Sequence, residues 1–115
     1  MKINKFEEIL AWQKSRLLAN RVYDLFKDSK DYSFHDQIIR AVISIMNNIA
    51  EGFERDSDKD FKRFLYISKA SCAEVRSMLY LGMDLKFITE NEFNELYGLA
   101  MEISKMLSGF IKKLN

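Results

Sequence analysis

The stretch QIIRAVISIMNNIAEG, residues 37–52, decides the fold, because its apolar side chains recur at helical spacing on more than one face. One face carries apolar residues at intervals of three and four: Ile38, Ala41, Ile45 and Ile49. Further apolar residues extend this face around both sides of the helix. A surface this broad needs neighbours on several sides, so the stretch predicts a nearly buried helix inside a bundle.

A polar strip crosses this apolar helix. Its members lie three or four residues apart and therefore stack along one narrow line: Arg40, Ser44, Asn48 and Glu51. An antiparallel hairpin folded at residues 54–56 places Arg40 opposite Glu74. The same register places Glu51 opposite Arg63, so the sequence predicts two ion pairs at the two ends of the interface between the second and third helices.

The predicted role of these ion pairs is to fix the register of the two helices, because a buried charge pair adds little net stability but is costly to break singly. Between the ends, the register brings two further groups together: Ser44 with Ala70 and Ser71, and Asn48 with Tyr66 and Ile67. A different role stays open, in which Arg40, Asn48 and Glu51 face a central pore or a ligand.

The composition favours an all-α fold, since the 115 residues include no proline and four glycines, and strand patterns are missing. Four helix starts carry a capping residue followed three positions later by a carboxylate: Asn4 with Glu7, Ser33 with Asp36, Ser57 with Asp60, and Thr89 with Glu92. We predict one domain over residues 1–115, an antiparallel up-down-up-down four-helix bundle. Its helices are expected at about residues 5–27, 34–53, 58–85 and 90–113.

Residue types that support catalysis or metal binding are scarce. His35 is the only histidine and Cys72 the only cysteine, and neither a glycine-rich phosphate loop nor a nucleophile elbow is present. The sequence therefore predicts no enzyme activity, no metal and no cofactor. The lone cysteine, the missing signal segment and the lack of an apolar run of ~20 residues lead us to expect a soluble, cytoplasmic protein that does not enter a membrane.

Any nucleic-acid site must be a local basic patch, because 18 Lys and Arg residues are balanced by 17 Asp and Glu residues and the net charge is +1. Lys62, Lys69 and Arg76 recur every seven residues and so share one helix face. Arg55 and Lys59 precede them, and Lys14 and Arg21 join the same face if the first helix is adjacent. The candidates for binding nucleic acid are therefore Lys14, Arg21, Arg55, Lys59, Lys62, Lys69 and Arg76. These residues form either a phosphate-binding stripe or an ordinary solvated face.

Aromatic residues on and just after the third helix offer a possible base-stacking surface: Phe61, Phe64, Tyr66, Tyr80 and Phe87. Their helical spacing favours a place in the core instead. The fourth helix and its approach are comparatively acidic, with Asp84, Glu90, Glu92, Glu95 and Glu102. This segregation of charge also suits head-to-side self-association.

Three groups of residues carry a resemblance to a known family. They are Trp12-Gln13-Lys14 with Tyr23; Gln37, Arg40-Ala41, Ser44-Ile45 and Asn48-Ile49-Ala50-Glu51-Gly52; and Phe64-Leu65, Ile67, Ser71 and Glu74. Over most of its length the chain resembles the bacterial four-helix-bundle proteins encoded in intervening sequences of 23S ribosomal RNA genes, the S23-type ribosomal protein family. It departs from the family pattern at Ile39, where a second arginine is common, and at Met46, where a proline is common.

The resemblance implies a non-catalytic protein that forms ring-like homo-oligomers, expected to be pentamers. Related accessory proteins of diversity-generating retroelements bind nucleic acid and a reverse transcriptase, so the possible partners include RNA or DNA and a partner protein. Our first interpretation is a homo-oligomer that associates with structured RNA through a basic face on the first and third helices. The alternative is a scaffold or accessory subunit that binds a partner polypeptide without contacting nucleic acid directly.

Overall fold

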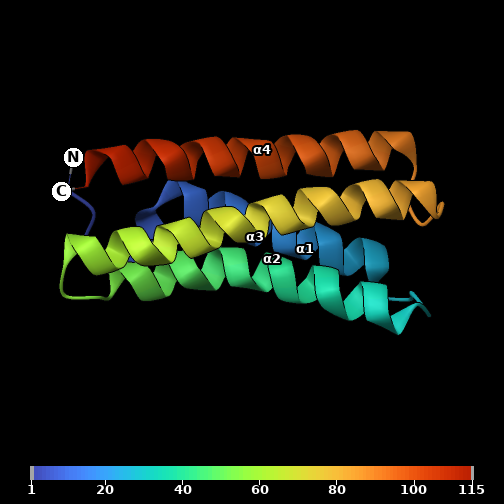
Figure 1. Ribbon diagram of the computed structural model, residues 1–115, viewed down its shortest axis with the longest axis horizontal. Coiled ribbons are helices and arrows are strands. Elements are labelled where there is room, and N and C mark those ends of the chain that lie inside the picture. Colours follow the sequence, from blue (N-terminus) through green and yellow to red (C-terminus); the bar gives the residue numbers. More distant parts are fainter. Residues whose placement is uncertain (1, 115) are drawn as a thin grey trace.

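The structure, a computed structural model, describes residues 2–114, which form four α-helices, one short 3₁₀ helix and no strand. The elements are η1 (Phe6–Glu8), α1 (Leu10–Phe26), α2 (Tyr32–Phe53), α3 (Asp58–Asp84) and α4 (Glu90–Lys113). The α-helices run side by side along a molecule of 43 × 22 × 19 Å (Figure 1). The predicted all-α four-helix bundle is confirmed, with α3 and α4 at nearly the expected bounds.

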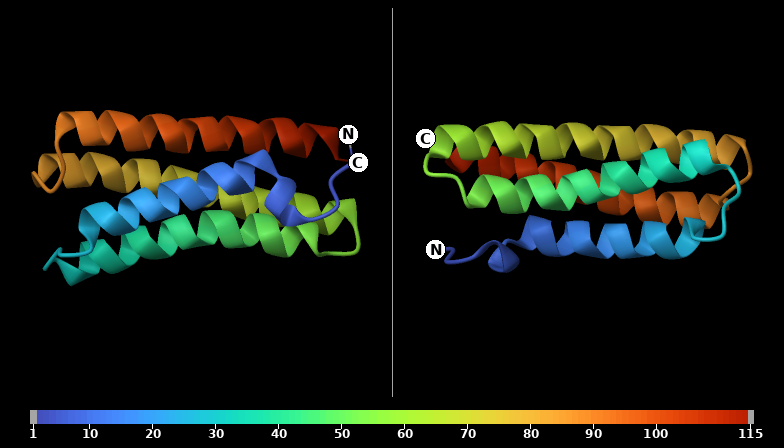
Figure 2. Two further views of the ribbon diagram at one scale, coloured as in Figure 1. Left: turned by 180° about the vertical axis from the view of Figure 1, so that it is seen from behind. Right: turned by 90° about the horizontal axis from the view of Figure 1, so that it is seen from below.

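Consecutive helices are antiparallel neighbours. α2 packs against α1 and α3, and α4 packs against α3 and α1, so α1 and α3 occupy opposite corners of the bundle and do not approach closely within the described residues. Figures 1 and 2 show the α2–α3 turn at the same end as η1 and the end of α4. The other two connections lie at the opposite end. The arrangement is the up-down-up-down bundle that short connections favour.

The core is organised around α2, as the breadth of its apolar surface predicts. Ile38, Ile45 and Ile49 are fully buried, and α2 has its widest contact with α3. At the end of α2, a Cβ added to Gly52 would stand 2.7 Å from the Cβ of Phe64 and 2.9 Å from the ring of Phe61. The two helices therefore approach this closely only because residue 52 has no side chain.

Two of the four predicted helix starts are confirmed. Ser57 accepts a hydrogen bond from the backbone N–H of Asp60 at 3.1 Å. Thr89 and Glu92 form a full capping box, in which each side chain accepts from the other residue's backbone N–H at 3.1 and 2.9 Å. These two caps fix the starts of α3 and α4 where the sequence places them.

The other two predicted starts are wrong. α1 begins at Leu10 after the 3₁₀ turn, and the backbone N–H of Asn4 donates to Glu8 instead of Asn4 capping a helix. At α2, Asp31 replaces Ser33 as the cap and accepts from the backbone N–H of Phe34 at 3.1 Å. Asp and Ser are comparable caps. The earlier start adds Tyr32 and Ser33 to the helix, and the buried Phe34 lies in its first turn.

Four apolar residues whose helical spacing predicts a place in the core lie on the surface instead. They are between 40% and 54% exposed: Leu10 and Leu17 on α1, and Ile67 and Leu81 on α3. Helical spacing shows which residues share a face, but the rotation of each helix against two neighbours decides how much of that face is covered. These exposed apolar residues leave surface available for a further contact.

Candidate nucleic-acid interface

The predicted ion pairs of the polar strip are not formed. Arg40 and Glu51 are exposed, and within residues 2–114 no ion pair joins Arg40 to Glu74 or Glu51 to Arg63. Glu74 accepts a hydrogen bond from the side-chain nitrogen of Gln37 at 3.0 Å. Arg63 lies 3.8 Å from Asp60 on its own helix. The prediction of two buried ion pairs is wrong because the charged residues at the ends of the strip lie at the solvent edge of α2.

The middle of the strip does join α2 to α3, through neutral groups. The hydroxyl of Ser71 donates to that of Ser44 at 2.8 Å, as the predicted register requires, and Asn48 donates to Ser44 from one turn away. The hydroxyl of Ser68, which is fully buried, donates to the backbone carbonyl of Ile45 at 2.7 Å. Hydroxyl hydrogen bonds therefore fix the register of this interface.

Two of the predicted phosphate contacts are occupied by carboxylates. Arg21 makes two hydrogen bonds of 2.8 Å to Glu95 on α4, and Lys14 lies 3.5 Å from Glu102 on α4. Hydrogen bonding to Arg21 lowers the pKa of Glu95. Because α1 and α3 sit at opposite corners, Lys14 and Arg21 do not share a face with the basic residues of α3. The predicted basic face on helices one and three is therefore wrong.

These pairings leave a different surface basic. Between residues 62 and 76 of α3 the sole carboxylate is Glu74, which is directed to Gln37 of α2. Between residues 101 and 112 of α4 the sole carboxylate is Glu102, which is directed to Lys14 of α1. The edge where α3 meets α4 therefore contains cations and no carboxylate over these two spans.

Helix geometry identifies the cations on that edge. Arg76 contacts α4 directly, because its Nη1 donates to the sulfur of Met101 at 3.1 Å. On α3, residues 62 and 69 lie at heptad spacing from Arg76 and so share its face. On α4, residues 105 and 112 follow Met101 by four and eleven positions and so share the face of Met101. We name the resulting surface the α3–α4 seam: Lys62, Lys69, Arg76, Lys105 and Lys112.

Arg76 is the residue on the seam with unused binding capacity. Its guanidinium carbon lies 5.9 Å from the ring centroid of Tyr97, and its Nε is buried without a hydrogen-bond partner among the described residues. No carboxylate pairs with it within residues 2–114. One turn away, burial raises the pKa of the Cys72 thiol to about 12, although the charges of Arg76 and Lys69 act to lower it.

The remaining basic candidates gather near the α2–α3 turn. The guanidinium groups of Arg55 and Arg63 lie 4.7 and 4.8 Å from the ring centroid of Phe64. Lys59 and Lys62 border an open hollow of about 640 Å³, which Tyr66 and Ile67 also line. Carboxylates lie among these cations at the turn, with Asp60 also lining the hollow, so this end of the bundle is mixed in charge and only Lys62 belongs to the α3–α4 seam.

The aromatic residues divide between core and surface. Phe61 and Phe64 are buried, as their spacing predicts, whereas Tyr66 is 57% and Tyr80 50% exposed. The Tyr80 ring packs against Phe93 and Tyr97 of α4, with centroid distances of 4.9 and 5.6 Å. The core position that spacing favours is therefore wrong for the two tyrosines, and also for Phe87, which is 38% exposed. The hydroxyl groups of the tyrosines were a signal for a place at the surface.

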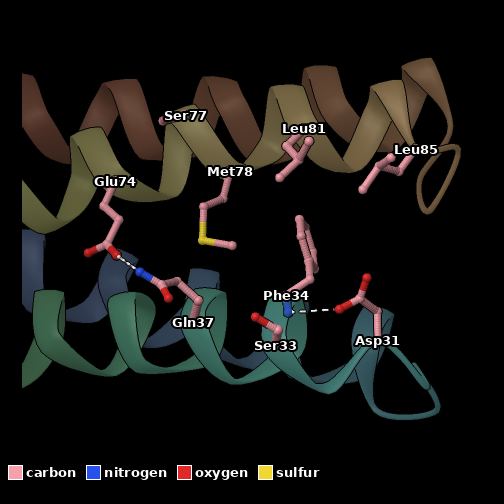
Figure 3. A pocket seen from close by; sticks show the side chains of 9 residues that line it. All are labelled: Asp31, Ser33, Phe34, Gln37, Glu74, Ser77, Met78, Leu81 and Leu85. Carbon is pink, nitrogen blue, oxygen red and sulfur yellow. Dashed lines mark hydrogen bonds between the residues drawn. The ribbon is translucent and has the colours of Figure 1, made fainter.

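A second open surface lies between α2 and α3, at the end away from the turn. Figure 3 shows the side chains of Phe34, Met78 and Leu81 between the two helices, with Asp31 and Glu74 towards either end. The groove has a volume of about 590 Å³ and contains no basic residue in its lining. An apolar floor with carboxylates at its ends suits a basic amphipathic partner.

Groups for catalysis or metal binding do not converge within residues 2–114. No set of three or more His, Cys, Asp or Glu residues there could hold a metal ion. His35 lies 2.9 Å from its neighbour Asp36 at the surface end of α2, and Cys72 is buried. In the same part of the chain, no helix is long and apolar enough to cross a membrane.

Comparison with known proteins identifies the family. The family model described as 23S rRNA-intervening sequence protein matches residues 7–109. The chain belongs to this family. The match covers α1, α2, α3 and nearly all of α4, and it confirms the resemblance recognised in the sequence. In this member of the 23S rRNA-intervening sequence protein family, Asn48 of the motif donates to Ser44 within α2, and Ser44 accepts from Ser71 of α3.

A solved structure shows the same fold. It is the 1.70 Å crystal structure of a protein of unknown function from the S23 ribosomal protein family of Bacteroides thetaiotaomicron VPI-5482. The two chains are 28% identical and align with a TM-score of 0.85, over 90% of this chain and 100% of that chain. A comparison with curated proteins found no match. The relation of this 23S rRNA-intervening sequence family member to retroelement accessory proteins stays a prediction.

Proposed function

We propose that this member of the 23S rRNA-intervening sequence protein family is a non-catalytic homo-oligomer, assembled as a ring, that associates with structured RNA through the α3–α4 seam. The proposal rests on one observation, which is that the carboxylates of α3 and α4 near the seam point away from it. Glu95 and Glu102 pair with α1 and Glu74 binds α2, so the seam keeps its positive charge while the whole chain is nearly neutral. Such a stripe favours phosphate groups irrespective of sequence.

Exposed groups support the homo-oligomeric part of the proposal. Arg40 and Glu51 carry opposite charges on one face of α2 and form no ion pair within residues 2–114. Leu17, Ile67 and Leu81 are each at least 40% exposed. A second copy could cover these apolar residues and pair the charges. Assembly would also place several seams in one particle and raise the affinity for a long RNA by avidity.

A charge-reversal titration tests the proposal. Lys62→Glu combined with Lys69→Glu changes the seam, whereas Lys27→Glu combined with Lys30→Glu changes the net charge equally near the α1–α2 connection. The proposal expects the seam variant to lose most of its affinity for a structured RNA, and the control to keep affinity within about threefold. An equal loss of RNA affinity in the seam variant and in the control, or no RNA binding by the wild-type chain, would contradict the proposal.

The alternative function is a scaffold that binds a partner polypeptide. The acidic, apolar groove between α2 and α3 favours this candidate, because a basic amphipathic helix could place an apolar side chain over Met78 and Leu81. A specific protein that copurifies after nuclease treatment, and that is lost on Leu81→Glu but kept in the seam variant Lys62→Glu/Lys69→Glu, would support the scaffold. Loss of copurifying protein on nuclease treatment would support the RNA proposal.

A further inference from the structure

Three cations and two tyrosines lie along the edge of α3 that faces α4. Steps of three and four residues keep its members on one side of the helix: Lys62, Tyr66, Lys69, Ala73, Arg76 and Tyr80. We name this line the Lys-Tyr edge. It begins near the α2–α3 turn and ends where Tyr80 meets α4.

The tyrosines and the cations of the edge differ in exposure. Tyr66 is 57% and Tyr80 50% exposed, while Lys62, Lys69 and Arg76 are half-buried. A half-buried Lys or Arg rests its carbon stem on the protein and keeps its charged end in water. The tyrosine rings therefore stand outermost on the edge, with positive charge placed between them.

Tyr80 is held in position by its surroundings. Phe93 and Tyr97 pack against its ring, and Phe93 also stacks on Tyr97 with the two ring centroids 5.2 Å apart. Arg76 lies over Tyr97 in the same cluster. A ring supported on one side and open on the other can stack on a planar ligand at little cost in side-chain entropy.

We infer that the Lys-Tyr edge binds an unpaired stretch of nucleic acid, with bases stacked on Tyr66 and Tyr80 and phosphates held by the cations between them. This inference rests on the proposed function and names the form of nucleic acid that the seam takes. Stacking on aromatic rings needs bases whose faces are open, and a duplex offers none along its length. A structured RNA would therefore be held at a loop, a bulge or an end.

Two pairs of variants separate stacking from charge. Tyr66→Ala and Tyr80→Ala remove a ring, whereas Tyr66→Phe and Tyr80→Phe keep the ring and remove the hydroxyl. We measure binding of a labelled RNA without self-pairing, and of the same RNA annealed to its complement, by fluorescence anisotropy. The inference expects tighter binding of the unpaired RNA, a loss of about tenfold for each alanine substitution and near wild-type affinity for each phenylalanine substitution.

The possible failures are distinguishable. Duplex binding as tight as that of unpaired RNA, with unchanged affinity in both alanine variants and lost affinity in Lys62→Glu/Lys69→Glu, would overturn the stacking inference and leave the proposed function standing. No binding of either RNA by the wild-type chain would overturn both. Tyr66 makes no ring contact within residues 2–114, so Tyr66→Ala tests stacking even if Tyr80→Ala disturbs the Phe93 cluster.

Discussion

At the scale of single residues, two glycines of the helices have opposite roles. A Cβ at Gly52 would collide with Phe64 at 2.7 Å, whereas a Cβ at Gly98 meets nothing within 4 Å. Gly52→Ala should lower the free energy of unfolding by about 1–3 kcal/mol through overpacking. Gly98→Ala should raise it by about 1 kcal/mol, because alanine favours the helix. Urea unfolding of both variants checks the pair, and a stabilising Gly52→Ala would contradict the close approach of α2 and α3.

Cys72 gives a prediction about pH. Burial raises its pKa to about 12 from an ordinary value of 9.0, so between these values the unfolded thiol ionises while the folded thiol stays neutral. Folding stability associated with this group is complete below pH 9 and falls as the pH rises towards 12. Alkylation of the native protein at about pH 9 should therefore proceed only through opening of the fold, and rapid alkylation without unfolding would show that the thiol is accessible.

At the scale of the elements, the end of α3 contains a strained residue. Lys86 has a φ of 64°, in the left-handed region that glycine adopts most easily, and its N–H donates to the carbonyl of Met83 at 3.0 Å. Lys86→Gly should raise the free energy of unfolding by about 1 kcal/mol, while Lys86→Ala should give no such gain. Thermal unfolding of the two variants measures the difference, and equal midpoints would argue against the strain.

The contact between α1 and α4 should depend on pH. Hydrogen bonding to Arg21 lowers the pKa of Glu95, so its contribution is present above the ordinary carboxyl value of 4.5 and is lost as the pH falls through the lowered value. Arg21→Gln should lower the thermal midpoint slightly at neutral pH, with the difference vanishing in acid and shrinking in high salt, because the pair is exposed. A pH-independent difference would show that Arg21 acts through packing alone.

The elements also show how far the sequence could predict the structure. The number, order and approximate bounds of the helices follow from apolar spacing and from the caps at Ser57 and Thr89. The site could not be predicted as well, because spacing does not set the rotation of a helix about its own axis. That rotation places Arg40 at the solvent edge and Tyr66 and Tyr80 on the surface.

At the scale of the whole molecule, the corner positions of α1 and α3 decide where charge is available. The sequence predicts Lys14 and Arg21 on one face with α3, but the bundle directs them to the carboxylates of α4. Because Glu95 and Glu102 pair with α1, they do not neutralise the basic residues of the α3–α4 seam. Heptad spacing identified the basic residues of α3, and the packing of all four helices was needed to recognise the surface that they share with α4.

The central claim is that the seam binds phosphate groups, and its most direct test is the salt dependence of RNA affinity. The affinity of the wild-type chain should fall steeply as salt rises, and the slope of log affinity against log salt should drop by roughly one on Lys69→Gln. Lys30→Gln should leave the slope unchanged. A slope that is near zero in the wild type, or unchanged by Lys69→Gln, would contradict the account.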